Sequence, residues 1–518
     1  MRLLVAIPCL DEAATIAAVL AGILRELIHG GFVDRDFVAE NVDGLDALER
    51  AVAPFTPEAV AIRADVPADA IREAARLFGS ARKGSVTAGT GVNMSGWSNL
   101  TEYLVACMNS ICGRFRRAGD RVVNPGVLTT RRVFKAQSLP PYKIDGYGKP
   151  LRSRPDMPPA VCGLPTSALA DEILLTGDDR VRALITIGGN PMRAWPDPIR
   201  TKAALEKLEL HVVVDPRFTD TARLADIVLA PKLPLESPGS TLSTENLFTV
   251  SPALGYSEPY GQYAAPIVAP PQGSDLREDW EFFYGLAQRM GLELELPAGV
   301  FPIPGIKTPR TKLDMQSKPS SEEMLDLVTK GSRIELERLR RDPGTVLFYD
   351  EEPVFVEARD AGNAAKLQVG NALLLDDLLA FAAGDLYARA GYDYRLVSRR
   401  MANTFNSLGT DIDALTRRYG TNPAFVHPED LASAGLARGD LVRVTSPHGE
   451  IEAVAWPDPD LRRGVVSMCH CWGAMPGEAS DVRKAGINTG LLISVEEDCS
   501  RFSGIPLMSA IPVRLARA

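Results

Sequence analysis

The sequence predicts an α/β fold with parallel sheets, followed by a C-terminal β-barrel. Two patterns carry this prediction. Between residues 181 and 231, short apolar runs alternate with helical patterns, which is the order of a parallel sheet. After about residue 389 the pattern changes to short strands joined by turns, which is typical of a mainly β domain. The chain has 518 residues, and that length favours about three domains.

The composition indicates a soluble protein of a reducing compartment. Lys and Arg number 57 against 66 for Asp and Glu, and the net charge of −9 is spread along the chain. This balance argues against nucleic acid or an anionic membrane as the main partner. The 7 cysteines are irregularly spaced, and no apolar run reaches the length of a membrane span, about 18 residues. We therefore expect a cytoplasmic protein with no membrane span and no nucleic-acid partner.

The first residues predict a strand, a turn and a helix. Residues 3–7 form a short apolar run that Pro8 ends, and residues 11–28 have a mostly apolar helical pattern. The segment 1–23 resembles the nucleotide-sugar end of a family 2 glycosyltransferase of the GT-A fold, as a remnant of such a start. The Asp-x-Asp metal motif of those enzymes does not follow. A working glycosyltransferase is therefore a remote alternative.

From residue 24 to 129 we expect part of an α/β lobe. It includes an amphipathic helix that begins near Ala68, directly after Pro67. Pro and Arg become dense between residues 124 and 165, which predicts an irregular crossing between lobes. A polar stretch from 302 to 322 indicates a surface insertion.

The second lobe, residues 130–388, carries the strongest local signal. Strands are expected at 183–187, 211–214 and 227–229, and helices at 196–208 and 219–225. The first strand leads into the turn Gly188, Gly189, Asn190 and Pro191, and the second leads into Asp215. At the carboxyl edge of a parallel sheet, glycines let backbone N–H groups approach a phosphate or a base, and an acidic residue can bind ribose hydroxyls. A glycine pair alone also fits an ordinary tight turn.

Residues 389–518 are expected to form the C-terminal barrel. Two apolar alternating runs, 441–445 and 451–456, flank a turn at 446–449 and predict a hairpin. A further strand is expected at 464–468.

Three linked blocks resemble the molybdopterin oxidoreductase family. They are residues 184–191, 212–222 and 225–239, and stretches at 396–407, 427–442, 486–489 and 503–506 are similar to the family's C-terminal dinucleotide-binding barrel. The family includes formate dehydrogenases, nitrate reductases, and dimethyl sulfoxide and biotin sulfoxide reductases. The resemblance covers roughly residues 24–518 and implies a member that is truncated at its N-terminus.

The resemblance implies two molybdopterin guanine dinucleotides on one molybdenum or tungsten atom. On the matching positions, Gly188, Gly189, Asn190, Asp215, Thr219 and Thr221 would hold a guanosine end, and Ser398, Arg399, Asn403, Asn406 and Asn488 would line the pterin or the pyrophosphate. The residue chemistry agrees with these roles. A guanidinium donates two parallel hydrogen bonds to phosphate oxygens, and amides match the edge of a pterin, which has both donors and acceptors. The alternatives are a solvated strand end for Arg399 and a turn asparagine for Asn488.

The cysteines form no recognisable metal motif. Cys469 and Cys471 would face one side of a strand and His470 the other, which favours small core cysteines. Cys107 and Cys112 would lie about 140° apart on a helix with no third cysteine nearby, so a 4Fe-4S cluster is not supported in this chain. The sequence identifies no metal ligand and no catalytic residue.

These patterns predict a molybdopterin-dependent oxidoreductase, or its cofactor-binding C-terminal portion, with two-electron chemistry on a small-molecule redox substrate. The main alternative is a non-catalytic remnant or subunit that only binds the dinucleotide. We expect an electron-transfer or complementing subunit as a partner, because loss of part of a lobe exposes apolar surface.

Overall fold

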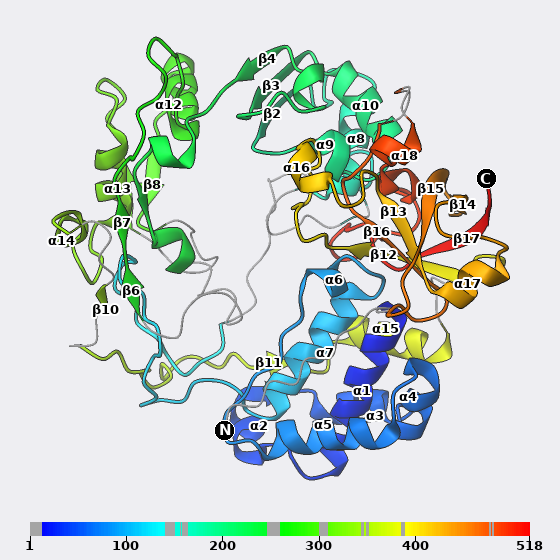
Figure 1. Ribbon diagram of the computed structural model, residues 1–518. Helices are drawn as coiled ribbons and strands as arrows, with labels where there is room; N and C mark the ends of the chain where they lie inside the picture. Colours follow the sequence, from blue (N-terminus) through cyan, green and yellow to red (C-terminus); the bar gives the residue numbers. More distant parts are fainter. Residues whose placement is uncertain are drawn as a thin grey trace.

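The computed structural model shows a helical lobe, an α/β unit, a closed barrel and a group of small sheets (Figure 1). It describes residues 13–139, 151–155, 157, 164–245, 259–299, 309–342, 347–348, 352–384, 389–475, 478 and 481–518. Among these residues, no helix is long and apolar enough to cross a membrane.

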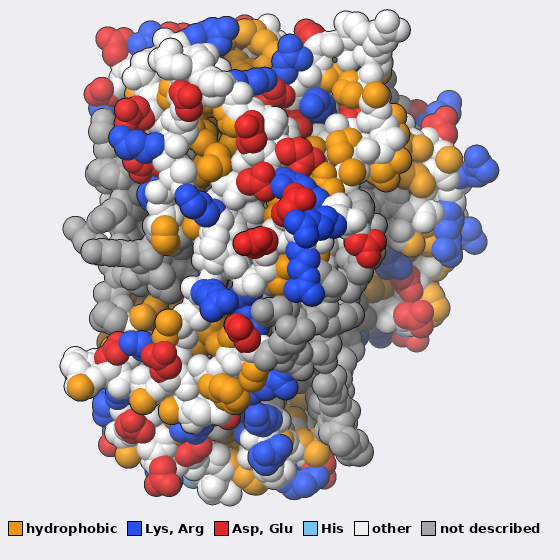
Figure 2. All heavy atoms as spheres, turned by 90° about the vertical axis from the view of Figure 1, so that its left-hand side faces the viewer, with side chains coloured by type: hydrophobic (Ala, Val, Ile, Leu, Met, Phe, Trp, Pro, Cys, Tyr) orange, Lys and Arg blue, Asp and Glu red, His pale blue; other side chains and the backbone are white. Residues whose placement is uncertain are grey.

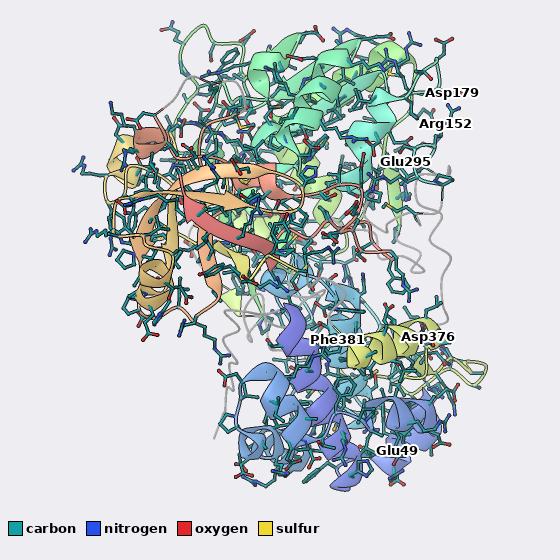
Figure 3. All side chains as sticks on the ribbon, turned by 90° about the vertical axis from the view of Figure 1, so that its right-hand side faces the viewer. Glu49, Arg152, Asp179, Glu295, Asp376 and Phe381 are labelled. Carbon is teal, nitrogen blue, oxygen red and sulfur yellow. The ribbon has the colours of Figure 1, made fainter. Side chains whose placement is uncertain are left out.

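The helical lobe joins the first part of the chain to a much later helix. Its helices are α1 (Ala13–His29), α2 (Arg35–Asn41), α3 (Leu45–Val52), α4 (Pro57–Ala64), α5 (Ala68–Ser80), α6 (Thr90–Asn93), α7 (Ser98–Ile111) and α15 (Ala372–Ala383). One apolar core includes Leu24, Leu48, Leu104 and the α15 residue that Figure 3 labels, Phe381, and all four are fully buried. The short strand β1 (Val42–Asp43) pairs in parallel with β11 (Leu367–Gln368).

Two expected domain boundaries look different in space. The predicted boundary at residue 23 falls inside α1, and residues 1–12, with the expected strand 3–7, lie outside the described residues. In the segment 24–129, expected as part of an α/β lobe, the regular elements are helices, apart from the short strand β1. The physical reason is that its helices bury their apolar faces against one another and against α15, with no sheet between them.

The α/β unit follows the predicted order closely. It contains α8 (Thr166–Leu174), β2 (Ala183–Ile187), α9 (Pro191–Ala194), α10 (Pro198–Lys207), β3 (Leu210–Val214), η1 (Ala222–Leu224) and β4 (Ile227–Leu229). The strands form a parallel sheet in the order β2, β3, β4. Helices α8 and α10 share an apolar cluster that includes Ile173 and Ala204.

A group of short elements lies on the far side of the molecule from the barrel (Figure 1). The elements are β5 (Gly239–Ser240), β6 (Tyr260–Gly261), β7 (Tyr263–Ala264), α12 (Asp279–Met290), β8 (Glu295–Pro297), β9 (Arg310–Lys312), α13 (Ser321–Thr329), α14 (Leu336–Arg340), β10 (Leu347–Phe348) and η2 (Pro234–Glu236). Figure 2 shows acidic and basic side chains intermingled over this side. The expected insertion at 302–322 falls partly here, and its residues 302–308 lie outside the described part.

The C-terminal region forms the predicted barrel. Its strands are β12 (Tyr394–Arg399), β13 (Pro423–Val426), β14 (Leu441–Thr445), β15 (Glu450–Pro457), β16 (Val465–Cys469) and β17 (Ile511–Arg517), closed in the order β12-β16-β13-β15-β14-β17. Short helices lie in the loops between the barrel strands: α16 (Asp413–Thr416), α17 (Pro428–Ser433), α18 (Val482–Ala485) and η3 (Thr489–Leu492). The predicted hairpin is β14 and β15, with Val444 opposite Ile451.

Candidate functional site

The carboxyl edge of the parallel sheet holds the predicted glycine turn. Gly188 has φ +54°, and a Cβ atom added there would meet no atom within 4 Å. Its N–H donates to the carbonyl oxygen of Val214 at 2.9 Å, and the N–H of Asp215 donates to that of Leu229 at 3.1 Å. Gly189 follows in the same turn. The ends of all three strands are therefore tied together, with open space beside Gly188.

Asp215 lies at this edge with few partners of its own. Its carboxylate accepts the backbone N–H of Arg217 at 2.8 Å. Partial burial raises the pKa of Asp215 above its usual value, although the N–H and the charge of Arg217 oppose the rise. The Arg217 guanidinium pairs with Asp411. Among the described residues, the Asp215 carboxylate thus has no ion-pair partner in hydrogen-bonding contact.

Two predicted residues of the same edge are buried and hold each other. The Thr221 hydroxyl donates to the side-chain oxygen of Asn190 at 2.8 Å and accepts the N–H of Met192 at 3.1 Å. Thr221 is fully buried and Asn190 nearly so. Thr219 accepts the N–H of Ala222 at 3.2 Å. Asn190, Thr219 and Thr221 therefore brace the loops that follow the strand ends.

The barrel contributes a second group at the end of β12. Ser398 is exposed, and its hydroxyl donates to the carbonyl oxygen of Met508 at 3.2 Å. Arg399 pairs with Asp458 at 2.8 Å, and its guanidinium carbon lies 3.9 Å from the centroid of the Phe425 ring. That guanidinium is engaged on the barrel by these two contacts. The reason is strand alternation, which sends neighbouring side chains to opposite faces.

Arg400 is exposed at the end of β12, and so are several residues of the loop that follows it. The Arg400 guanidinium donates to the side-chain oxygen of Asn406, which has φ +53°. Asn403 is exposed in the same loop. Arg400 was not among the predicted cofactor residues, although the alternation of β12 was a signal that could have identified it.

Three contacts join the sheet edge to the barrel. The Arg193 guanidinium lies 3.4 Å from the Thr410 hydroxyl, and Arg217 pairs with Asp411. The fully buried Asn488 donates to the carbonyl oxygen of Arg193 at 3.1 Å. Asn488 and the loop residues Thr410 and Asp411 therefore lie beside the sheet edge, at a junction where Figure 1 shows α16 beside α9. The sequence held no signal for the 410–411 contacts.

The neighbouring cysteines are core residues. Cys469 and Cys471 are buried, and burial raises the pKa of both thiols, that of Cys471 to about 12. Burial, together with the charge of Arg400, lowers the pKa of His470 to about 4. Within the described ranges, no three His, Cys, Asp or Glu side chains converge as a metal site.

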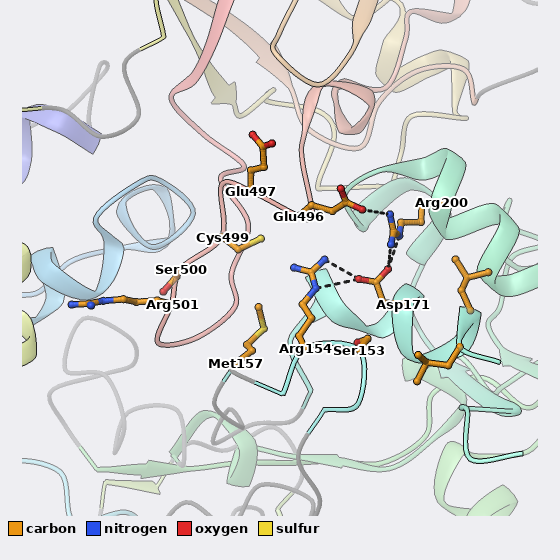
Figure 4. Close-up of a pocket in the computed structure, with 12 residues that line it drawn as sticks. Ser153, Arg154, Met157, Asp171, Arg200, Glu496, Glu497, Cys499, Ser500 and Arg501 are labelled. Carbon is orange, nitrogen blue, oxygen red and sulfur yellow. Dashed lines mark hydrogen bonds and ion pairs between the residues drawn. The ribbon is translucent and has the colours of Figure 1, made fainter. Parts of the chain in front are cut away.

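A separate cavity of about 700 Å³ lies between α8, α10 and the loop 494–503 (Figure 4). Its wall carries the buried carboxylate of Asp171, which pairs with Arg154 at 2.8 Å and with Arg200. Arg200 also pairs with Glu496 at 2.7 Å. These charges satisfy one another across the junction, and none of the predicted cofactor residues lines this cavity.

The carboxyl edge of a parallel sheet, with a glycine turn at its end, is the place where open α/β folds bind nucleotides. Comparison with known families indicates the class of protein. A family model described as "Molydopterin dinucleotide binding domain" matches residues 394–511, which is the barrel.

Relatives with similar sequences extend over most of the chain. Formate dehydrogenase 2 subunit alpha of Methanococcus maripaludis is 25% identical over 464 residues, 85% of this chain and 61% of the relative. Trimethylamine-N-oxide reductase of Haemophilus influenzae is 23% identical over 526 residues, 88% of this chain and 58% of the relative. The chain is therefore a relative of the molybdopterin oxidoreductases, and it spans about three fifths of the length of these proteins.

The fold has a close counterpart among solved structures. Acetylene hydratase from Pelobacter acetylenicus superposes with a TM-score of 0.68 at 17% sequence identity, covering 98% of this chain and 70% of that one. This similarity confirms the α/β architecture with a C-terminal barrel.

Proposed function

We propose that the chain binds a molybdenum or tungsten bis(molybdopterin guanine dinucleotide) cofactor at the junction between the β2–β4 edge and the barrel. It would act as an oxidoreductase, or as its cofactor-binding portion, on a small redox substrate. The observation that carries the proposal is the convergence of the glycine edge with a dinucleotide-binding barrel through the contacts of Arg193, Arg217 and Asn488.

The hydrogen-bonding groups at the sheet edge fit a guanine nucleotide. Guanine presents two neighbouring N–H donors, and the Asp215 carboxylate is a matching pair of acceptors with only the Arg217 N–H bound to it. Gly188 leaves room for backbone approach. The exposed apolar residues Ile187 and Phe218 offer surface for a planar base.

The barrel side supplies groups for the pterin and the phosphates. Arg400 carries a guanidinium that can fork onto phosphate oxygens while Asn406 orients it. Asn403 provides an exposed amide, and Ser398 an exposed hydroxyl. Asn190, Thr221 and Asn488 keep the loops in place. When bound, the cofactor supplies the two-electron redox chemistry, and the protein supplies binding and orientation.

A complementing subunit follows from the surface of the α/β unit. Ile185 of β2 and Ile227 of β4 are exposed on the sheet. Exposed apolar surface of this kind marks an interaction site. We propose that a partner chain covers this apolar surface and contributes residues to the active site. We also propose that the assembled protein works in the cytoplasm, in keeping with the few and scattered cysteines.

The proposal is tested by isolating the protein from cells grown with molybdate or tungstate. We expect bound metal and two guanine nucleotides per metal, measured by elemental analysis and by chromatography of nucleotides released in acid. Metal and nucleotide at the background of an unrelated purified protein would contradict the proposal. Bound cofactor without turnover of formate or trimethylamine N-oxide would instead support the binding-only alternative.

A further inference from the structure

A basic cavity of about 830 Å³ lies outside the candidate cofactor site. It lies between α2, the loop after α7 and the segments 134–138 and 356–359, next to β11. Figure 1 shows α2 and the start of that loop at the opposite end of the molecule from β2–β4. The cationic residues that line it are Arg114, Arg116, Arg117, Lys135 and Arg359, and the described lining has one acidic residue, Glu40. This is a concentration of positive charge in a chain of net charge −9.

Two of these cations have a carboxylate partner. Arg117 pairs with Asp34 at 2.8 Å, and Lys135 pairs with Asp360. Both pairs are partly exposed, so each contributes little to stability. They neutralise only part of the positive charge around the cavity.

Arg114 and Arg359 are held by neutral acceptors. Arg114 donates to the carbonyl oxygen of Ala81 at 2.7 Å, and Arg359 donates to the side-chain oxygen of Asn41 at 2.7 Å. The Nε atoms of both arginines are buried and have no hydrogen-bond partner among the residues that the structure describes. A buried donor without a partner is unfavourable, and it is a group that a bound anion can satisfy directly or through water.

Arg116 has neither a hydrogen bond nor an ion pair with any residue that the structure describes. Its guanidinium carbon lies 5.3 Å from the centroid of the Phe134 ring. Arg116 is exposed at the surface, and its partial burial still lowers its pKa, which the charge of Asp120 only partly opposes. A cation in this position gains from a bound anion more than a paired surface arginine does.

Aromatic rings complete the wall of the cavity. Phe37 and Phe115 are stacked with their centroids 5.7 Å apart and their planes 9° apart. Phe115 is 44% exposed, and Phe134 also lines the cavity. The exposed ring of Phe115 beside the guanidinium groups favours a ligand that combines a planar ring with negative charge.

We propose that this cavity binds a nucleoside diphosphate or triphosphate. The arginines would hold the phosphates, since guanidinium groups bind phosphate oxygens in pairs, and the Phe rings would stack on the base. The volume lies within the range of sites for small ligands, roughly 300–1,000 Å³. The site is separate from the proposed cofactor junction, because the two share no residue.

The test measures ADP, ATP and pyrophosphate binding by calorimetry on the full chain, at low and high salt. We expect saturable binding of ADP that weakens by about tenfold or more in Arg116→Ala, because a charge-assisted contact to phosphate is lost. Phe134→Leu should weaken ADP binding and leave pyrophosphate binding unchanged. The matched control is Arg338→Ala, an exposed arginine of α14 outside the cavity, which should bind ADP like the unaltered protein.

Three results would overturn the inference. They are no saturable binding of ADP or ATP, equal ADP binding by Arg116→Ala and the unaltered protein, and pyrophosphate binding as tight as that of ADP. Circular dichroism and thermal unfolding identify a variant that fails to fold, and Arg116→Lys then replaces it, since it keeps the charge and loses the paired geometry. Loss of cofactor guanine nucleotide from Arg116→Ala would assign the cavity to the cofactor, which also contradicts the inference.

Discussion

At the scale of single residues, Asp215 is the most informative side chain of the candidate cofactor site. Its carboxylate has one backbone donor, from Arg217, and partial burial raises its pKa. A carboxylate with free acceptor capacity in such a place gains when a ligand brings hydrogen-bond donors. Guanine brings two, so this residue connects the geometry of the sheet edge to the identity of the base.

We predict that Asp215→Ala lowers the amount of guanine nucleotide retained by protein isolated after growth with molybdate. The change leaves donors of the base unpaired, at about 1–3 kcal/mol, or roughly 5- to 150-fold in affinity. Chromatography of the nucleotide released in acid measures the retained amount. Asp178→Ala, an exposed aspartate of the same unit, is the control. Equal retention by Asp215→Ala and the unaltered protein would refute the role of Asp215.

Arg399 and Arg400 are adjacent arginines, and the sequence alone does not decide which of them is available to bind phosphate. The resemblance placed a phosphate-binding arginine at the end of β12, and the structure has two candidates there. Arg399 pairs with Asp458 against the Phe425 ring, while Arg400 reaches the exposed loop of Asn406. Adjacent residues on a strand point to opposite faces, so the choice between them depends on which face meets the barrel core.

At the scale of elements, Asn488 couples the α/β unit to the barrel. Its amide nitrogen donates to the carbonyl oxygen of Arg193 in α9, and its side-chain oxygen accepts the N–H of Gly490 at the start of η3 at 2.8 Å. The side chain is fully buried. A buried amide that satisfies two backbone groups from different elements fixes their relative position.

We predict that Asn488→Ala destabilises the protein by about 1–3 kcal/mol, because it leaves the Arg193 carbonyl and the Gly490 N–H without partners in a buried place. Unfolding in guanidinium chloride, followed by circular dichroism, measures the change. Asn403→Ala, at an exposed position of the barrel loop, should leave stability unchanged. A destabilisation of Asn488→Ala no larger than that of Asn403→Ala would contradict the coupling role.

At the scale of the whole molecule, the barrel and the α/β unit dock through apolar and ionic contacts together. Met475 of the barrel region packs against Met192 and Leu205 in one buried cluster. Close by, His448 of the β14–β15 turn lies 3.6 Å from the carboxylate of Asp197, which caps α10. The apolar cluster is insensitive to pH, whereas the histidine pair is not.

The titration of this pair has a defined direction. The hydrogen bond with Asp197 raises the pKa of His448 against the effect of burial. Burial raises the pKa of Asp197, but the bonds from His448 and from the Arg200 N–H outweigh it and leave that pKa below its usual value. The pair therefore stabilises the folded state to its full extent only between two pH values. The lower is the ordinary pKa of aspartate, about 3.9, and the upper is the ordinary pKa of histidine, about 6.5.

We predict that His448→Gln lowers the free energy of unfolding at pH 5.5 and changes it little at pH 8.5. The stabilisation is lost as pH rises through the raised pKa of His448, and its size is under about 1 kcal/mol because the pair is partly exposed. Denaturant unfolding at both pH values measures it. His29→Gln, at the end of α1, is the control. An equal effect of His448→Gln at both pH values would show that the pair does not titrate as described.

The sequence alone determined the local elements and the class of binding partner. Alternating apolar runs predicted β2, β3 and β4, and the spacing of Gly188 and Asp215 placed both at one edge of the sheet, because those patterns follow from local periodicity. Only the tertiary structure decided which residues meet across distant parts of the chain. It paired α15 with the N-terminal helices, buried Asn488 between lobes, and gathered four arginines and Lys135 from the segments 114–117, 134–138 and 356–359 into one cavity. Such contacts depend on long-range packing, which leaves no periodic trace in the sequence.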